Sequence, residues 1–334
     1  MPSLSRRTRP GPNSNRMYTV IKAESPRQKR AFFSLSRACG YSRDEAEYLR
    51  LFCCPANASY FMALKDGRPK ARILVWKDAA YEKNIGRRTA FFAFLDGDEN
   101  AFALLLEAAQ NAYPDAEALT GPVPPDGSGL FTGQCDRPCG TDRGAFTGPG
   151  DAGQTQALLE AGFAPCMTEA CFEIAVPAVN PYRAYAGRLS ARFGVCVQKA
   201  RFGLFGDGLS RAAYELAGAW QSETALQAGR IRRYISPRFS FVALDGNGRA
   251  LGYVMTLRGR PLLRVTTLIT KDVPFRPAVT LLLLDALCES LIQSGIMRAE
   301  ASVIDVNNRP SVRLTQGTGA RETRRYVRYY KELT

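Results

Sequence analysis

Histidine is absent from all 334 residues of the chain. Imidazole is the base of Ser-His-Asp and Cys-His nucleophile systems and the commonest side-chain metal ligand. Its absence excludes both kinds of nucleophile system and every His-ligated metal site. Acid–base chemistry in this protein must therefore use Asp, Glu, Tyr, Lys, Cys or water.

Long apolar runs are also missing. The longest run near the C-terminus, residues 281–284, ends at Asp285 and is too short to cross a bilayer. The first sixteen residues are rich in Ser, Arg, Pro and Gly and lack the apolar segment of a secretory signal. We expect a disordered basic tail over residues 1–16, no membrane span, and a soluble cytoplasmic protein.

Cysteine is present in a pattern that does not suggest disulfides or a metal. The nine cysteines are odd in number and irregularly spaced. Only Cys135 and Cys139 approach a metal-ligand spacing, and no second pair stands at a matching distance. We therefore expect reduced thiols, as in a cytoplasmic protein, and no metal.

The net charge of +14 favours anionic partners. A phosphate-bearing cofactor, a nucleic acid and an acidic surface all fit this charge. No zinc finger and no RNP-like aromatic pattern occurs in the sequence, so we do not expect nucleic acid. Composition leaves the oligomeric state open.

A weak internal repeat divides the chain into two halves. Two segments read as β-hairpins, two later segments as Leu-rich helices, and two as the strands that follow. The hairpins are residues 60–71 and 240–251, the helices are 104–109 and 282–287, and the following strands are 117–120 and 299–304. A looser match joins residues 158–163 to 314–320. The repeat predicts two tandem α/β (α+β) domains, 17–176 and 183–334, each a mixed sheet flanked by helices.

This order of elements resembles the GNAT superfamily of acyl-CoA-dependent N-acyltransferases, most closely in the second half. The resemblance implies transfer of an acetyl or other acyl group from CoA to a primary amine. Its partners are then a CoA thioester and an amine acceptor, with no metal. The amine attacks the thioester directly, so no protein nucleophile is needed, which agrees with the absence of histidine.

The first GNAT motif is a glycine-rich loop whose backbone N–H groups bind pyrophosphate at a helix N-terminus. Residues 276–281 occupy this place. Arg276 fits the first position, whereas Val279 and Leu281 replace small residues and Pro277 removes one N–H donor. The resemblance makes Arg276, Ala278, Val279 and Thr280 candidate cofactor-binding residues.

The second motif begins with Asn-x-x-Ala and continues into a helix. Asn308 and Ser311 match its start, and Gly319 matches its glycine. The resemblance makes Asn308 and Ser311 further candidate cofactor contacts. Thr315 stands where the family has a tyrosine that protonates the departing thiolate, and its hydroxyl is a far weaker acid than a phenol.

Candidate catalytic groups follow from the same comparison. Tyr326 and Tyr329 are candidates to replace the missing tyrosine, and Tyr330 is a third; the alternative is that they pack in the last strand. Glu300, in the strand beside the thioester position, is the candidate base. Asp305 is the other candidate, and the alternative for Glu300 is a solvent-facing strand position.

Charge distinguishes the two halves. Carboxylates crowd residues 96–99 before the helix of the first half and would repel a pyrophosphate. Before the corresponding helix of the second half lie Lys271, Asp272 and Arg276, with a net positive charge. We therefore expect any CoA site in the second half, with the first half structural or shaping the acceptor pocket.

The segment 121–153 is rich in Gly and Pro and too long for an ordinary connection. It either closes over the acceptor site or forms a mobile surface loop.

Two alternatives to an enzyme of this class remain open from the sequence. One is a non-catalytic tandem-GNAT protein that binds CoA or another anion, and the other is an aminoacyl-tRNA-dependent transferase.

Overall fold

The computed structural model describes residues 18–55, 57–125, 131, 133–135, 146–150, 152–200, 202–203, 206–207, 234–258 and 262–333. The expected tail, residues 1–16, lies outside this part. The chain forms two compact units. Unit 1 consists of Met1–Pro125, Ala152–Ala164 and Tyr329–Thr334, and unit 2 of Asp126–Asp151 and Pro165–Arg328. Both combine helices with a mixed sheet, which confirms the predicted fold class.

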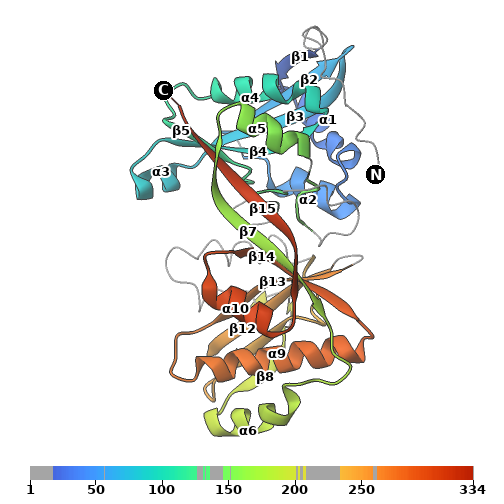
Figure 1. The fold of residues 1–334 in the computed structure, drawn as a ribbon, viewed down its shortest axis with the longest axis vertical. Helices are drawn as coiled ribbons and strands as arrows, with labels where there is room; N and C mark the ends of the chain where they lie inside the picture. Colours follow the sequence, from blue (N-terminus) through green and yellow to red (C-terminus); the bar gives the residue numbers. More distant parts are fainter. Residues whose placement is uncertain are drawn as a thin grey trace, which may run out of the picture. The chain divides into compact units, whose positions relative to one another are not determined.

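Each unit takes one strand from the other half of the sequence. Strand β7 (Ala164–Ala175), at the end of the first half, pairs with β14 (Arg298–Asp305) in unit 2. Strand β15 (Arg321–Glu332), at the end of the second half, runs beside β7 and then pairs with β5 (Ala118–Gly121) in unit 1 (Figure 1). The compact units therefore differ from the continuous halves 17–176 and 183–334, because the two last strands are exchanged and Asp126–Asp151 belongs to unit 2.

Unit 1 is a sheet with helices on it. Its strand order is β1-β2-β3-β4-β5 followed by the end of β15, antiparallel except for the parallel pair β4–β5. The strands before β5 are β1 (Tyr18–Lys22), β2 (Ser59–Lys65), β3 (Arg68–Lys77) and β4 (Thr89–Gly97). The helices are α1 (Pro26–Ala38), α2 (Arg43–Phe52), α3 (Ala79–Ile85), η2 (Glu99–Ala101), α4 (Phe102–Gln110) and α5 (Ala152–Glu160). The β2–β3 pair confirms the predicted hairpin.

Local sequence signals start the first two helices. Ser25 and Gln28 form a reciprocal capping box at α1, and Ser42 and Glu45 form one at α2. Each box satisfies backbone N–H groups that a helix N-terminus leaves without an intrahelical partner. The start of both helices is therefore encoded within four residues.

Unit 2 repeats the plan on a longer sheet. Its strand order is β15-β7-β14-β13-β12-β11-β8, with the short β6 (Gln134–Cys135) on the other edge of β15. The remaining strands of this sheet are β8 (Cys196–Lys199), β11 (Phe241–Leu244), β12 (Ala250–Leu257) and β13 (Leu263–Thr270). A separate pair is formed by β9 (Phe202–Gly203) and β10 (Gly206–Asp207). The β11–β12 pair confirms the second predicted hairpin.

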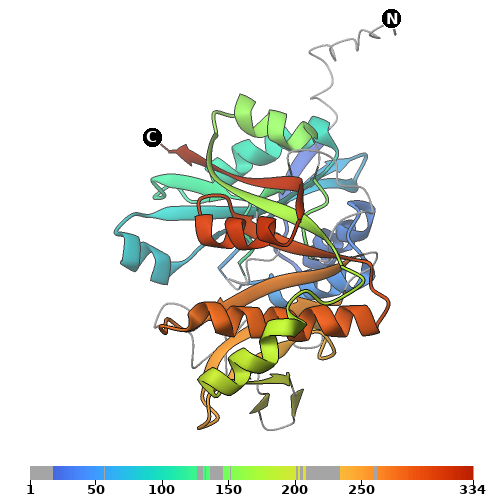
Figure 2. The same cartoon turned by 60° about the horizontal axis from the view of Figure 1, so that its bottom comes forward.

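Helix α9 (Arg276–Gln293) supplies the core of unit 2. It lies along the strands with α6 (Arg183–Phe193) beside it, and α10 (Arg309–Gly317) follows β14 (Figure 2). Its apolar side chains pack on Leu263, Val254 and Ala299 of the sheet. Gly252 on β12 allows the close approach, since a Cβ there would stand 2.8 Å from the Ile269 carbonyl oxygen and 3.2 Å from Leu283. Gly295, with φ of 66°, follows the last turn of the helix and allows the chain to turn away there.

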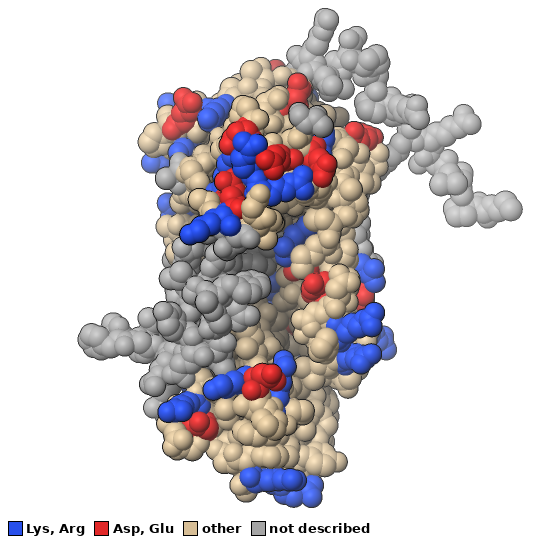
Figure 3. Space-filling model, turned by 90° about the vertical axis from the view of Figure 1, so that its left-hand side faces the viewer, with Lys and Arg blue, Asp and Glu red and all other residues tan. Residues whose placement is uncertain are grey.

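The visible surface of unit 1 carries charges of both signs. Figure 3 shows Lys and Arg side chains interleaved with Asp and Glu on the visible face of unit 1. Arg88 pairs with Glu117, and Lys77 pairs with Asp115. Within the described residues, no helix is both long and apolar enough to cross a membrane.

A buried ion pair occupies the core of unit 1. Arg72 on β3 is completely buried and donates two hydrogen bonds to Asp96 on β4, at 3.1 and 2.7 Å. It also donates to the Phe32 carbonyl oxygen and to Ser36 of α1, both at 2.9 Å. Tyr41 donates to the other oxygen of Asp96. The pair thus ties two strands to a helix.

Replacing Arg72 by leucine should destabilise the protein strongly, because it leaves the Asp96 carboxylate buried without its cation. Loss of one partner of a buried pair costs roughly 3–5 kcal/mol. The exposed Arg88–Glu117 pair provides the control, since Arg88→Leu should change stability by about 1 kcal/mol or less. Urea unfolding followed by circular dichroism measures both. Equal effects would show that the Arg72 contacts have no special role.

Candidate functional site

The parallel strands β13 and β14 separate soon after they meet. They pair only over Leu263–Val265 and Ala299–Ala301. A register shift on β13 leaves Thr266 without a partner position on β12, and a second shift interrupts β14 after Ala301. Such irregularities bend a strand and end its pairing. The result is an opening in the sheet beyond Val265 and Ala301.

A groove runs from this opening to the start of α9. Its inner part, a cavity of about 270 Å³, is lined mostly by aliphatic side chains, among them Ile174, Val265, Leu287 and Ala301. Its outer part, about 400 Å³, lies between the first turns of α9 and of α10. The two parts share Leu268, Leu284, Ser311 and Leu314. This shape suits a narrow, mainly apolar ligand arm with a polar end.

Four of the six candidate cofactor residues line this groove. Arg276 and Thr280 line its outer part, Asn308 its inner part, and Ser311 lines both. Arg276 Nε donates to Thr270 Oγ1 at 3.0 Å, and Asn308 caps α10 by accepting from the Ser311 backbone N–H.

The other two candidates do not line the groove. Val279 is completely buried in the core beneath α9, and Ala278 is buried as well. Val279 packs in the core against the sheet, whereas Thr280, turned about 100° from it, and Arg276, in the first turn, line the outer part of the groove. Thr315, at the position of the family's tyrosine, also lines the inner part and donates its hydroxyl to the Ser311 carbonyl oxygen.

The backbone donors at the start of α9 are already used. The Arg276 N–H donates to the Val273 carbonyl, and the Ala278 and Val279 N–H groups donate to that of Phe275. Pro277 has no N–H. The narrow, mainly apolar groove suits a pantetheine-like arm. Because the backbone amides are engaged, a diphosphate at the groove mouth would depend on cationic side chains such as Arg276.

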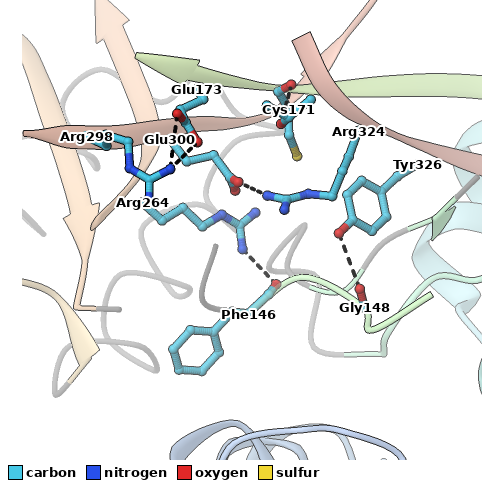
Figure 4. Close-up of polar contacts among 10 residues, drawn as sticks. Phe146, Gly148, Cys171, Glu173, Arg264, Arg298, Glu300, Arg324 and Tyr326 are labelled. Carbon is cyan, nitrogen blue, oxygen red and sulfur yellow. Dashed lines mark hydrogen bonds and ion pairs between the residues drawn. The ribbon is translucent and has the colours of Figure 1, made fainter. Parts of the chain in front are cut away.

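The opposite face of the sheet carries a buried polar cluster (Figure 4). Leu263 and Ala299 face α9, so the alternation of strand residues directs Arg264 and Glu300 to the other face. Both are almost completely buried, with exposed fractions of 1% and 0%. They are register partners on the middle of the three paired rungs, one residue before the strands separate. Ser302, two residues beyond Glu300 on β14, lines the inner part of the groove.

Glu300 forms an ion pair with Arg324 of β15 through its Oε2 oxygen. Its Oε1 oxygen is buried and has no hydrogen-bond partner among the described residues. The solvent-facing alternative for Glu300 is thus wrong, because the side chain is enclosed. A carboxylate oxygen beside the opening can accept a proton or hydrogen bond from a bound group.

The two candidate tyrosines occupy different places. Tyr326 lies two residues from Arg324 on the same side of β15, is completely buried, and donates to the Gly148 carbonyl oxygen at 3.3 Å. Tyr329 is three residues further on, points to the other side by strand alternation, and belongs to unit 1. The fold therefore brings Tyr326, and not Tyr329, to the polar cluster.

Part of the Gly- and Pro-rich segment covers the cluster. Arg264 donates to the Phe146 carbonyl oxygen at 2.7 Å, and β6 pairs with β15 at Cys135 and Tyr326. Gly133 is required at its position, since a Cβ there would stand 2.8 Å from the Cβ of Tyr326. We call the described residues 131–135 and 146–148 (132 excepted) the covering segment.

Sequence reasoning missed Arg264, Arg324 and Cys171 as parts of this cluster. Cys171 on β7 is completely buried, and burial raises the pKa of its thiol to about 11 against the opposing effect of the two guanidinium groups. An available signal was Arg264 itself, a charge within the apolar sequence Leu262–Val265. Arg324 gave no such signal, because it stands among the charged and polar residues 321–325.

The corresponding opening in unit 1 is filled. Strands β4 and β5 pair over Thr89–Phe91, and then the Val123 N–H donates to the Phe92 carbonyl at 2.7 Å. A Cβ on Gly121 would stand 2.3 Å from that same oxygen. Gln154 of α5 donates to the Leu95 carbonyl, so α5 fills the place where α10 leaves a groove in unit 2.

Solved structures show the same architecture. A tandem GNAT protein from the clavulanic acid biosynthesis pathway superposes with a TM-score of 0.58 at 15% identity, covering 95% of this chain and 99% of that one. A GCN5-related N-acetyltransferase from Sphaerobacter thermophilus gives 0.54 at 13% identity, covering 95% and 96%. No family model and no curated protein sequence matches the chain. The fold is therefore that of a tandem GNAT protein, as the sequence resemblance predicts.

A third solved structure shows a similar fold as one region of a longer, multi-domain protein. The GCN5-related glucosamine N-acetyltransferase region of a fungal multi-domain GH3 β-N-acetylglucosaminidase gives a TM-score of 0.62 at 11% identity. The match covers 94% of this chain and 38% of the fungal chain. Among the described residues, no group of three or more His, Cys, Asp or Glu side chains is placed to hold a metal.

Thiol reactivity should report whether the polar cluster is closed to solvent. Cys171 should resist iodoacetamide at pH 8, because its thiol is buried and its pKa is about 11. The exposed Cys166 and Cys196 should react within minutes and serve as internal controls. Mass spectrometry of tryptic peptides measures all three. Labelling of Cys171 as fast as that of Cys166 would contradict a closed cluster.

Proposed function

We propose that the protein is an N-acyltransferase that takes an acyl group from a CoA thioester and transfers it to a primary amine. The opening between β13 and β14 is the observation on which this rests. An apolar groove lies beside this opening on one face of the sheet, and the Glu300 carboxylate lies next to it on the other face. Thioester and amine can thus approach one another from opposite faces.

In this proposal the groove of unit 2 holds the thioester arm. Ile174, Val265 and Leu287 contact its apolar part, and Arg276 binds the diphosphate, because the nearby backbone amides are engaged. Asn308 and Ser311 flank the arm from α10. The CoA thioester supplies an activated acyl carbon. Unit 1, whose opening is filled, has a structural role.

The transfer itself needs one base and one acid. The amine attacks the acyl carbon, Glu300 Oε1 accepts a proton from the amine nitrogen, and the bond to sulfur breaks. Tyr326 lies on the amine's face of the sheet, away from the groove, and donates to the Gly148 carbonyl oxygen, so the leaving thiolate takes its proton from water in the groove. Tyr329 has no part in this scheme. Asp305, which lines the groove, is the second candidate base.

Arg276→Glu should weaken acetyl-CoA binding at least tenfold, because it replaces the cation at the groove mouth with an anion. Arg68→Glu makes the same charge change on an exposed hairpin of unit 1 and should leave affinity unchanged. Isothermal titration calorimetry with acetyl-CoA measures both variants. Unaltered affinity in Arg276→Glu would place the CoA site elsewhere.

Glu300→Gln should reduce acyl transfer about 100-fold or more while acetyl-CoA affinity is retained, as expected when a general base is removed. The assay measures thiol release from acetyl-CoA with a panel of primary amines. Glu173→Gln, which changes a half-buried carboxylate on the same sheet face, is the matched control and should remain active. Acetyl-CoA binding without thiol release from the unmodified protein would favour a non-catalytic binding protein.

A further inference from the structure

The groove of unit 2 continues past the opening between β13 and β14. Its outer part meets α9 at Arg276, and its inner part reaches Leu287, about 16 Å further along the helix axis. On the sheet, the inner part extends to Ile174, whose register partner on β14 is Ala299. Ala299 lies two residues before Ala301, where the pairing with β13 ends. The cavity therefore runs about 7 Å back along the paired rungs.

The reacting carbon has to lie short of this inner end. In the proposed reaction the amine reaches the acyl carbon from the face of Glu300, at the opening that begins beyond Val265 and Ala301. The thioester arm enters the groove at the start of α9, so it meets the opening before it meets Ile174 and Leu287. The part of the arm that these two side chains contact is therefore the acyl chain, which continues past the thioester.

The walls of the inner part suit an uncharged aliphatic chain. Ile174 and Leu287 line it with aliphatic side chains. Thr315 and Thr318 also line it, but their hydroxyls donate to carbonyl oxygens of α10 itself, at 2.9 and 2.6 Å. No Lys or Arg occurs among the described residues that line this part, where Asp305 is the single charged side chain. An acyl group that ends in a carboxylate would be enclosed there without a cation, which is costly.

We propose that the acyl donor carries an uncharged aliphatic chain longer than acetyl, such as hexanoyl, with its end at Ile174 and Leu287. An extended chain advances by about 1.2 Å per bond, so the 7 Å beyond the opening holds about five or six carbons. This inference rests on the proposed function and names the class of donor. The amine nitrogen bonds to the acyl carbon and the carbon–sulfur bond breaks. Glu300 takes the amine proton, the thiolate takes a proton from water, and the chain passes unchanged into the amide.

Calorimetric titration of the unmodified protein with CoA and with acetyl-, butyryl- and hexanoyl-CoA measures how affinity depends on chain length. Each methylene that becomes fully buried should raise affinity about fourfold, and hexanoyl-CoA should bind at least tenfold more tightly than acetyl-CoA. Succinyl-CoA has as many acyl carbons as butyryl-CoA but ends in a carboxylate, so it should bind at least tenfold more weakly than butyryl-CoA. Equal affinity for acetyl- and hexanoyl-CoA, or for butyryl- and succinyl-CoA, overturns the proposal.

Ile174→Trp fills the inner end of the cavity and should bring the ratio of hexanoyl- to acetyl-CoA affinity toward one. The ratio cancels any effect on the part of the arm that both donors share. Ile85→Trp makes the same change at a position of unit 1 that is 59% exposed, and it should keep the ratio of the unmodified protein. Ile174→Ala enlarges the cavity and should shift the preference toward octanoyl-CoA, which tests the site even if thermal melting shows Ile174→Trp to be unfolded. A ratio that neither Ile174 variant alters contradicts the proposal.

Thiol release with a panel of primary amines separates this inference from the proposed function. If thiol is released from acetyl- and hexanoyl-CoA with equal affinity and rate, acyl transfer stands and the chain site fails. If chain length controls affinity in the unmodified protein but no amine is acylated, the chain site stands and the acyltransferase function fails. If neither CoA nor any of its thioesters binds, both fail.

Discussion

The short pairing of β13 with β14 is the constraint on which the functional part of the molecule depends. Three residues of each strand pair, and then irregularities in both strands force them apart. The pairing places Arg264 and Glu300 side by side, and the separation opens the groove beside them. A longer pairing would close the sheet between the aliphatic groove and the buried carboxylate.

The two units share an architecture but differ at the place where their parallel strands separate. Unit 1 fills its opening with Gln154 and closes it at Gly121, and its central charges, Arg72 and Asp96, satisfy each other and the first helix. Unit 2 keeps an opening and has a carboxylate oxygen without a partner at its edge. The charge difference that the sequence reveals before each central helix agrees with this asymmetry.

Periodicity and the internal repeat were enough to predict the hairpins, the helices and the fold class, because these depend on neighbouring residues. The exchange of β7 and β15 was not predictable in this way, since strand partners distant in sequence leave no local pattern. Val279 was expected at the cofactor because a motif was matched by position. Its place on the apolar side of α9 would have indicated the core. The ion pair of Glu300 with Arg324 joins strands whose sequences contain no sign of each other.

The exchanged strands also affect the order in which the chain can fold as it is synthesised. Thr120 of β5 donates to the Tyr329 carbonyl, a partner 209 residues later. At roughly 5–20 residues per second, β5 waits about 10–40 s for that partner to leave the ribosome. During this time the first half has an unfinished sheet edge, which can pair with other chains. The segment around Tyr329 therefore completes a domain most of which was translated about 200 residues earlier.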